Sequence, residues 1–253
     1  MLSEAQIASY REHGYVIPDF RLSDSLLDDL RADQKRLVER HADFRDICPN
    51  LLAYDLRFLE VARTPEILDM VGQVIGPDFA LWNSSLFSKP TRNGQRTPWH
   101  QDGQYWPIRP LATCTVWIAL DDSTTENGCL RVIPGSHHER RLRAHRSLDA
   151  DDVTLGQELD PSEYDPATAE DIVLEAGQMS LHDVYLLHSS EANHSSQPRR
   201  GMTLRFMPTT SVLDRDLATK LAHELNVLDH ADRTLFLMRG ADRSGLNDFR
   251  IRN

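Results

Sequence analysis

The chain of 253 residues has a hydrophobic content of 40% and a charged content of 26%, as expected of a globular protein long enough to bury a substantial core. Its formal net charge of −11 excludes a general nucleic-acid binder, because no basic excess is available for a phosphate backbone. The sequence has no run of about 18 apolar residues, so we expect no membrane-spanning helix. The three cysteines lack C-x-x-C spacing, so we expect reduced thiols and a cytoplasmic location.

The first 78 residues are predicted to be a helical support. The chain starts without the basic and apolar regions of a signal peptide. Ser3, Ser23 and Thr64 are suitable N-cap residues, and they predict helices over residues 4–14, 24–45 and 65–76. A short strand is expected at Tyr15 to Ile17, between the first two helices.

From Phe79 the pattern changes to short strands separated by turns. Strands are expected at residues 80–88, 113–120, 129–133, 172–174, 179–181 and 202–207. Turn signals such as Asn127-Gly128 and Pro134-Gly135 separate them. Short strands after a helical section predict an α+β fold, with a cupin-like jelly roll (double-stranded β-helix) and the N-terminal helices packed on one sheet.

A single domain over residues 1–253 accounts for this pattern. Residues 79–209 would form the jelly-roll core, and residues 210–253 a C-terminal extension with a helix near residues 216–225. The segment from about 140 to 170 is acidic and poor in apolar side chains. A structureless loop of that length is unusual unless it works as a lid, so we expect a lid over the barrel mouth.

The most informative motif is an H-x-D pair, His100 and Asp102, inside an aromatic-rich run bounded by prolines. On a strand, residues i and i+2 point to the same face and can converge on one ion. A catalytic metal needs a third ligand, for which His188 is the candidate, with His182 and His194 as alternatives. Two imidazoles and one carboxylate, with the opposite positions open, form the facial triad of non-haem Fe(II) oxygenases.

Arginines beyond the third candidate ligand predict sites for anions. Arg199, 11 residues further on, is the candidate anchor for a cosubstrate carboxylate, because a guanidinium fork matches two carboxylate oxygens. Arg200 is the alternative. Because successive side chains on a strand point to opposite faces, only one of the two arginines can point inward. If Arg199 points inward, Gly201, Thr203 and Arg205 do so too. A second inward guanidinium should not stay unpaired, so we expect Arg205 to meet an anionic group of the substrate.

The same alternation places Trp117 on one face of its strand with Thr115, while Val116, Ile118 and Leu120 pack outward against helices. Trp117 would then face the site, with simple core packing as the alternative.

A loop after the H-x-D strand would turn over the mouth of the barrel. Tyr105, Trp106 and Arg109 lie on it and are candidate substrate contacts, although both aromatics could serve only for packing. The ammonium of Lys89 could lie on the surface or equally in the site.

Four segments together resemble the phytanoyl-CoA dioxygenase family of iron- and 2-oxoglutarate-dependent oxygenases: HQDGQYWPIRP, CTVWIAL, NGCLRVIPGSH and HSSEANHSSQPRR. The resemblance is strongest from Leu86 to Arg205. It implies iron ligation by His100, Asp102 and His188, with Arg199 on the distal carboxylate of 2-oxoglutarate. It also implies cosubstrate contacts from Trp117 and Ser85.

The resemblance further implies Fe(II), 2-oxoglutarate and O2 as cofactor and cosubstrates. The family couples oxidative decarboxylation of 2-oxoglutarate to succinate with hydroxylation of an unactivated C–H bond. Halogenating relatives have a small residue where this sequence keeps Asp102, so hydroxylation is the expected outcome.

Two functions from different classes follow. The first is a hydroxylase of a small molecule, and Arg109 and Arg205 with Tyr105 and Trp106 would suit a compact anionic or zwitterionic substrate. The alternative is a non-oxidative jelly-roll metal-binding protein or metalloenzyme, which has no need of Arg199 as a carboxylate anchor. Oxygen uptake with iron and 2-oxoglutarate distinguishes the two.

Overall fold

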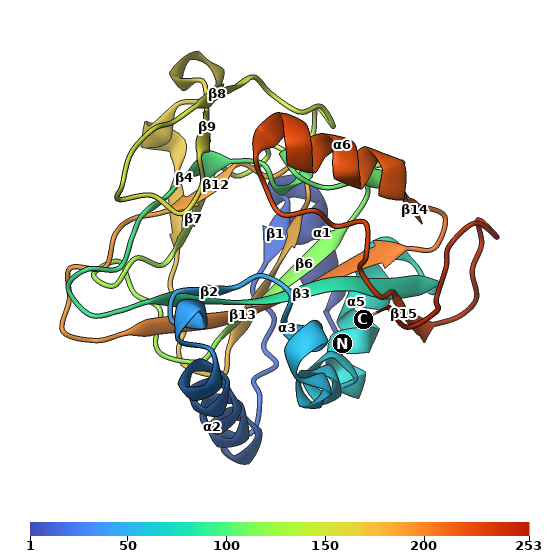
Figure 1. Ribbon diagram of the computed structural model, residues 1–253, viewed down its shortest axis with the longest axis horizontal. Helices are drawn as coiled ribbons and strands as arrows, with labels where there is room; N and C mark the ends of the chain where they lie inside the picture. The colour runs from blue at the N-terminus through green and yellow to red at the C-terminus, as the bar shows by residue number, and fades with distance from the viewer. Residues whose placement is uncertain (253) are drawn as a thin grey trace.

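Two antiparallel sheets form the frame of the protein in the computed structural model, which describes residues 1–252 (Figure 1). The larger sheet has seven strands in the order β1-β11-β6-β13-β3-β15, with β2 also paired to β3. Its strands are β1 Tyr15–Val16, β2 Ile47–Cys48, β3 Phe79–Lys89, β6 Cys114–Ala119, β11 Met179–Asp183, β13 Arg199–Pro208 and β15 Phe236–Arg239.

The smaller sheet has four strands in the order β10-β7-β12-β4. Its strands are β4 Thr97–His100, β7 Leu130–Val132, β10 Glu170–Ile172 and β12 His188–Ser190. Two further strand pairs complete the chain: β5 Ile108–Arg109 with β14 Val212–Leu213, and β8 His145–Ser147 with β9 Gln157–Leu159.

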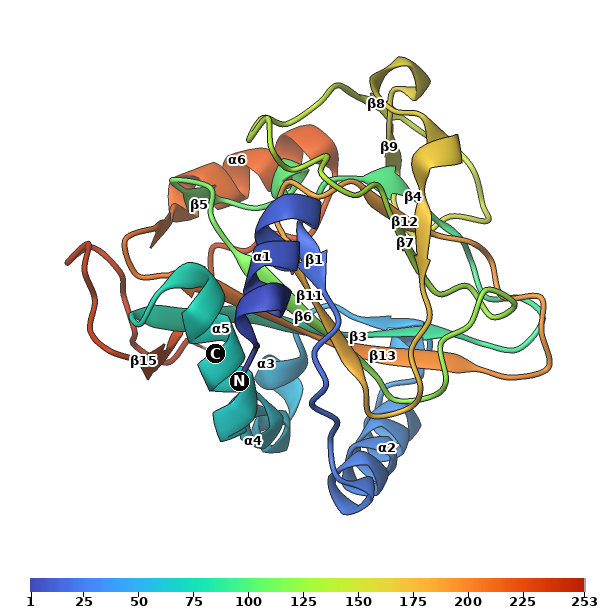
Figure 2. The ribbon, with the colours of Figure 1, turned by 180° about the vertical axis from the view of Figure 1, so that it is seen from behind.

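Helices cover the outer face of the larger sheet, and the last helix, α6, lies on the opposite side (Figure 2). The α-helices are α1 Glu4–His13, α2 Asp24–Arg40, α3 Leu51–Tyr54, α4 Leu59–Ala62, α5 Pro65–Ile75 and α6 Arg215–Leu225. Ser3 caps α1 with a capping box and Ser23 caps α2, as their positions predict. The mixed helix-and-sheet architecture with antiparallel sheets is therefore confirmed.

Strand alternation divides the larger sheet into an apolar outer face and a polar inner face. Val116 and Ile118 of β6 pack with Leu204 and Phe206 of β13 in the main core, together with residues of α1, α2 and α5. The residues between them, such as Thr115 and Thr203, line a cavity. The predicted alternation is confirmed, and it places one row of polar and charged side chains inside the protein.

Several element boundaries differ from expectation, including those of one helix and one strand. The helix expected over 24–45 ends at Arg40, because His41 leaves helical geometry with φ −137°, and residues Ala42–Phe44 form a separate 3-10 turn. The strand expected at 172–174 is β10, which ends at Ile172, and Val173 is 53% exposed. The helix expected in the C-terminal extension is present as α6, whereas strand β15 has no predicted counterpart.

The segment from 140 to 170 is not structureless. β8 and β9 form a hairpin, and Thr154 to Gln157 line the same cavity as the inner face of the larger sheet. The side chain of Tyr164 stacks near Trp99, with ring centroids 5.4 Å apart. The segment therefore forms a wall of the cavity.

The cysteines agree with a further expectation. Cys48, Cys114 and Cys129 are all buried free thiols. None of the helices within residues 1–252 has both the length and the apolar character that a bilayer span requires.

Candidate metal and cosubstrate site

Three side chains from two distant parts of the chain meet between the sheets. His100 ends β4, Asp102 begins the turn after it, and His188 begins β12, where it lies directly opposite His100 in the sheet ladder. The Oδ1 atom of Asp102 is 3.8 Å from Nε2 of His100 and 3.9 Å from Nε2 of His188. Within residues 1–252, the ligand atoms of these three groups lie within 4.8 Å of one another.

Both imidazoles are oriented by backbone carbonyls. Nδ1 of His100 lies 2.8 Å from the carbonyl oxygen of Pro98, and Nδ1 of His188 lies 2.9 Å from that of Leu186. Since a carbonyl only accepts, each Nδ1 carries the proton and each Nε2 keeps a free lone pair. Burial, then repulsion from His100, lowers the pKa of His188 to about 3, so this imidazole is neutral at pH 7.

Asp102 is held as a carboxylate. Burial alone would raise its pKa, but the neighbouring His182 and His188 side chains hold the pKa well below its ordinary value. The Thr115 hydroxyl donates to Oδ2 at 3.5 Å, and Nε2 of His182 lies 3.7 Å from the same oxygen. A neutral pair of imidazoles and one carboxylate is a donor set that suits Fe(II) and leaves part of the coordination sphere open.

The alternative third ligands occupy other positions. His182 on β11 also lines the cavity, but its Nε2 atom lies nearest Oδ2 of Asp102, whereas His100 and His188 lie nearest Oδ1. His194 lies exposed in the loop between β12 and β13. The structure thus brings His188 to the H-x-D pair and keeps His182 next to it as a neighbour of the carboxylate.

Arg199 points into the cavity and Arg200 points out of it. Arg199 is 4% exposed, and its Nε and Nη2 atoms donate to the carbonyl oxygen of Gly128 at 3.1 and 2.8 Å. Burial lowers the pKa of Arg199 to about 10, which still leaves it cationic at pH 7. Arg200 instead forms an ion pair with Asp121 at 2.7 Å and reaches Gln34 of α2. The alternation of side chains along β13 therefore places the two arginines on opposite faces, as expected.

Trp117 lines the cavity beside Arg199, whose guanidinium carbon lies 5.2 Å from the indole centroid. The indole lies over Gly201 of the neighbouring strand, where an added Cβ atom would be 2.3 Å from Trp117 Cζ2. The missing side chain at Gly201 leaves room for the indole of Trp117 beside Arg199.

Replacing Gly201 by alanine is expected to destabilise the protein by about 1–3 kcal/mol, because the new methyl group overlaps a buried ring that must move. Displacement of Trp117 should also weaken whatever Arg199 binds. Denaturant unfolding and the affinity for 2-oxoglutarate measure the two effects. Gly156→Ala is the control, since nothing lies within 4 Å of an added Cβ there. Equal stability of both variants would contradict the close contact.

Arg205 and Ser85 lie together at the other end of the inner face. Nη1 of Arg205 donates to Oγ of Ser85 at 2.9 Å, and the Ser85 hydroxyl donates to the carbonyl oxygen of Pro49 at 3.2 Å. Ser85 was expected to contact the cosubstrate, but its hydroxyl is engaged beside Arg205. Both residues line the cavity.

Lys89 is buried, at 4% exposure, rather than on the surface. Its ammonium donates to the carbonyl oxygens of Gln95 and Glu191, both at 2.6 Å, and ties β3 to the chain after β12. Burial, then the charge of Arg199, lowers its pKa to about 6.

The three residues expected to touch the substrate divide between two environments. Tyr105 and Trp106 line the cavity, and the Tyr105 hydroxyl has no hydrogen-bond partner within residues 1–252. Arg109 does not line it: its exposed guanidinium folds back on the carbonyl oxygens of Trp106 and Ile108. The structure does not bring Arg109 to the cavity, because the pairing of β5 with β14 turns its side chain away.

The cavity has a volume of about 390 Å³, which suits a small ligand. Part of its wall comes from a segment that no sequence signal singled out, residues Leu225 to Leu228 and His230 after helix α6. This polar tail has no periodic pattern, so its contribution depends entirely on tertiary contacts.

Comparison with known proteins finds a family model, described as phytanoyl-CoA dioxygenase (PhyH), that matches residues 1–201. Among curated relatives, a probable alpha-ketoglutarate-dependent hypophosphite dioxygenase of Stutzerimonas stutzeri is 28% identical over 148 residues, or 58% of this chain and 51% of that protein. The peroxisomal phytanoyl-CoA dioxygenase of Homo sapiens is 27% identical over 181 residues, or 69% of this chain and 51% of the relative. The chain thus spans about half the length of these relatives.

Solved structures resemble most of the chain. The non-heme monooxygenase ThoJ, in its apo form, has a TM-score of 0.75 and 25% identity over 97% of this chain and 88% of its own. EvdO2 from Micromonospora carbonacea var. aurantiaca, complexed with 2-oxoglutarate, has a TM-score of 0.68 and 24% identity over 82% of this chain and 91% of its own. The match of the family model over residues 1–201 shows that the chain belongs to the phytanoyl-CoA dioxygenase family.

Proposed function

We propose that the protein is an Fe(II)- and 2-oxoglutarate-dependent dioxygenase that hydroxylates an unactivated C–H bond of a small anionic or zwitterionic metabolite. One atom of O2 would enter the new hydroxyl group and the other the succinate formed from 2-oxoglutarate, with release of CO2. The observation that carries the proposal is the convergence of His100, Asp102 and His188 on one cavity that also contains the buried Arg199.

The two sheets would be the walls of a double-stranded β-helix within one domain of residues 1–253. In this arrangement residues 1–78 support the outer face, residues 79–209 form the core and residues 210–253 extend it. The β8–β9 segment, within the expected lid at about 140–170, would cover the mouth, which its contribution to the cavity wall supports.

His100, Asp102 and His188 would hold the ferrous ion, which supplies the activation of dioxygen. Their donor atoms already lie within 4.8 Å of one another, which supports this assignment. The presence of the carboxylate favours hydroxylation over halogenation, because halogenating relatives have a small residue there.

Arg199 would hold the distal carboxylate of 2-oxoglutarate, with Trp117 as the neighbouring surface. Arg205 lies six positions after Arg199 on β13, so their backbone positions are about 20 Å apart along an extended strand. This separation supports different roles for the two cations, with Arg199 holding the cosubstrate and Arg205 the primary substrate.

The proposal is tested by succinate formation and oxygen uptake with Fe(II), 2-oxoglutarate and a panel of small anionic and zwitterionic metabolites. We expect at least one compound to stimulate turnover and to gain one oxygen atom from ¹⁸O2. Stimulation only by acyl-CoA would contradict the substrate class. Bound zinc with no oxygen uptake above background would favour a non-oxidative metalloprotein.

A further inference from the structure

The end of the cavity that contains Arg205 is built partly by residues beyond position 201, where the match to the family model ends. Arg205 is 7% exposed and lies over Trp106, with its guanidinium carbon 5.1 Å from the ring centroid. Its Nε atom has no hydrogen-bond partner within residues 1–252. Arg205 is thus a buried cation with an unused donor.

A second buried cation lies close behind it. Arg233 is 3% exposed, and its Nη2 atom donates to the carbonyl oxygen of Pro49 at 2.9 Å. Burial, then repulsion from Arg205, lowers the pKa of Arg233 to about 9. Within residues 1–252, no carboxylate pairs with either guanidinium, and the acid that acts on Arg205 from further away is Asp102, which also faces the proposed metal. Positive charge therefore exceeds negative charge at this end of the cavity.

Arg233 also fixes the state of His230, which lines the cavity. Nε of Arg233 donates to Nδ1 of His230 at 3.1 Å. Because a guanidinium cannot accept, Nδ1 must be unprotonated and the ring proton must lie on Nε2. Burial, with repulsion from Arg233 and Arg205, lowers the pKa of His230 to about 3, so the ring is neutral. Its Nε2–H group makes no hydrogen bond within residues 1–252.

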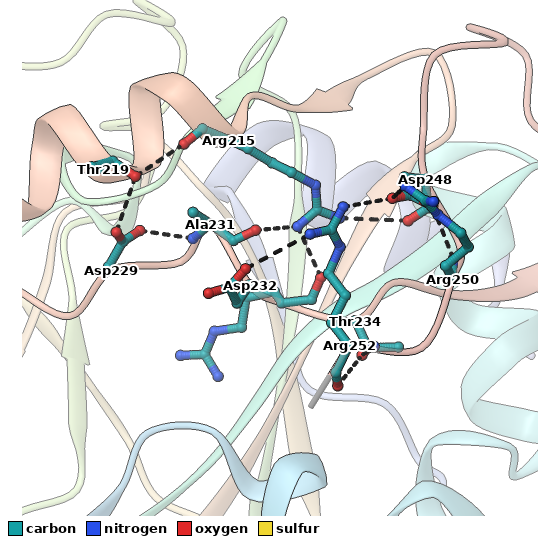
Figure 3. A network of polar contacts seen from close by, with 10 residues as sticks. Arg215, Thr219, Asp229, Ala231, Asp232, Thr234, Asp248, Arg250 and Arg252 are labelled. Carbon is teal, nitrogen blue, oxygen red and sulfur yellow. Dashed lines mark hydrogen bonds and ion pairs between the residues drawn. The ribbon is translucent and has the colours of Figure 1, made fainter.

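The segment that contains His230 and Arg233 is anchored by a polar network that Figure 3 shows. Arg215 of α6 donates to the carbonyl oxygens of Ala231 and Arg233. Thr219, also on α6, donates to Asp229 at 3.0 Å. The side chain of Trp82 packs edge-on against His230, with ring centroids 5.5 Å apart. The donors are therefore held in place before a ligand arrives.

We propose that Arg205 and His230, with Arg233 as a positioning residue, form a subsite that binds an oxyanion group of the substrate: a carboxylate, sulfonate or phosphonate. The proposal rests on the proposed function in that it assigns a substrate to this cavity. Guanidinium and Nε2–H groups only donate hydrogen bonds, so they suit a group that only accepts. A bound anion would also supply the negative charge that the buried arginines lack.

Anaerobic calorimetry tests the subsite with the full chain loaded with Fe(II) and 2-oxoglutarate. Three anions of matched shape (propionate, ethanesulfonate and ethylphosphonate) are compared with neutral propionamide. We expect at least one anion to bind, and propionamide to bind at least about 10-fold more weakly, as the loss of a charged hydrogen bond implies. No anion binding, or no anion that binds more tightly than propionamide, would overturn the proposal.

Two variants locate the binding. Arg205→Met and His230→Phe should each weaken anion binding by about 10- to 100-fold, whereas Arg63→Met, which removes a largely exposed charge between α4 and α5, should not. Thermal melting checks that the variants fold, and the comparison of propionate with propionamide requires no variant. Undiminished binding by both folded variants would contradict the assignment.

The positioning role of Arg233 has its own spectroscopic signature. Arg233→Met leaves Nδ1 of His230 without its donor, so ¹⁵N shifts of the ring should change from a single Nε2–H tautomer to a mixture. An unchanged tautomer would remove this role. Turnover without any preference for anions would overturn the subsite alone, whereas anion binding without turnover would overturn the proposed function alone.

Discussion

Replacing His188 by alanine is expected to abolish 2-oxoglutarate turnover and to lower the affinity for Fe(II) by more than about 100-fold. Loss of a residue that only supports a metal ligand costs about 10- to 100-fold in metal affinity, so loss of a ligand must exceed that range. The variant retains His100 and Asp102, whose Nε2 and Oδ1 atoms lie 3.8 Å apart. Two donors on one side of an ion hold it weakly and leave an additional position to water. Anaerobic metal titration and succinate formation measure the two effects.

His182→Ala is the matched control, because it removes a buried imidazole next to the same carboxylate. His182 lies 3.7 Å from Oδ2 of Asp102, whereas the other two imidazoles lie nearest Oδ1. We therefore expect it to reduce Fe(II) affinity by no more than about 10- to 100-fold, as a group that orients a ligand would. If His182→Ala lost the metal while His188→Ala kept it, the ligand set would be wrong.

The sequence was most informative where the structure follows from the alternation of side chains along a strand. His100 and Asp102 converge as expected, although Asp102 lies in the 3-10 turn after β4 and not on the strand itself. Alternation along β6 and β13 separates Thr115 and Thr203 from Val116 and Leu204 without knowledge of the fold. The same periodicity distinguished Arg199 from Arg200, once one of them was assumed to point inward. These features are local, so local reasoning recovered them.

Features set by contacts between distant segments could not be recovered in this way. Lys89 has no local signal for burial, which arises because the chain after β12 brings its carbonyl oxygens to the ammonium. Arg109 turns outward because β5 pairs with β14, about 100 residues later. His230 reaches the cavity only through the network that attaches its segment to α6. A substrate site made of such residues is visible only in the folded chain.

Replacing Arg199 by alanine is expected to raise the KM for 2-oxoglutarate by about 100-fold or more. Truncation of one partner of a buried charged pair costs about 2–5 kcal/mol, and each 1.4 kcal/mol corresponds to a factor of ten. Arg199 is well suited to this role because its fork is held by the Gly128 carbonyl oxygen on one side and rests on Trp117. Arg199→Lys should recover only part of the loss, since an ammonium cannot match both carboxylate oxygens. Succinate formation at varied 2-oxoglutarate concentration measures each KM.

Arg200→Ala is the matched control, because Arg200 is the next residue on the same strand. It removes the neighbouring guanidinium, which pairs with Asp121 on the opposite face of the sheet, so the KM for 2-oxoglutarate should stay within about twofold of the wild-type value. A raised KM in Arg200→Ala with a normal KM in Arg199→Ala would reverse the assignment. If Arg205→Ala alone raised the KM for 2-oxoglutarate, the two ends of the cavity would exchange roles. Because Arg199 and Arg205 lie at opposite ends of one strand face, these three variants together determine which end receives the cosubstrate.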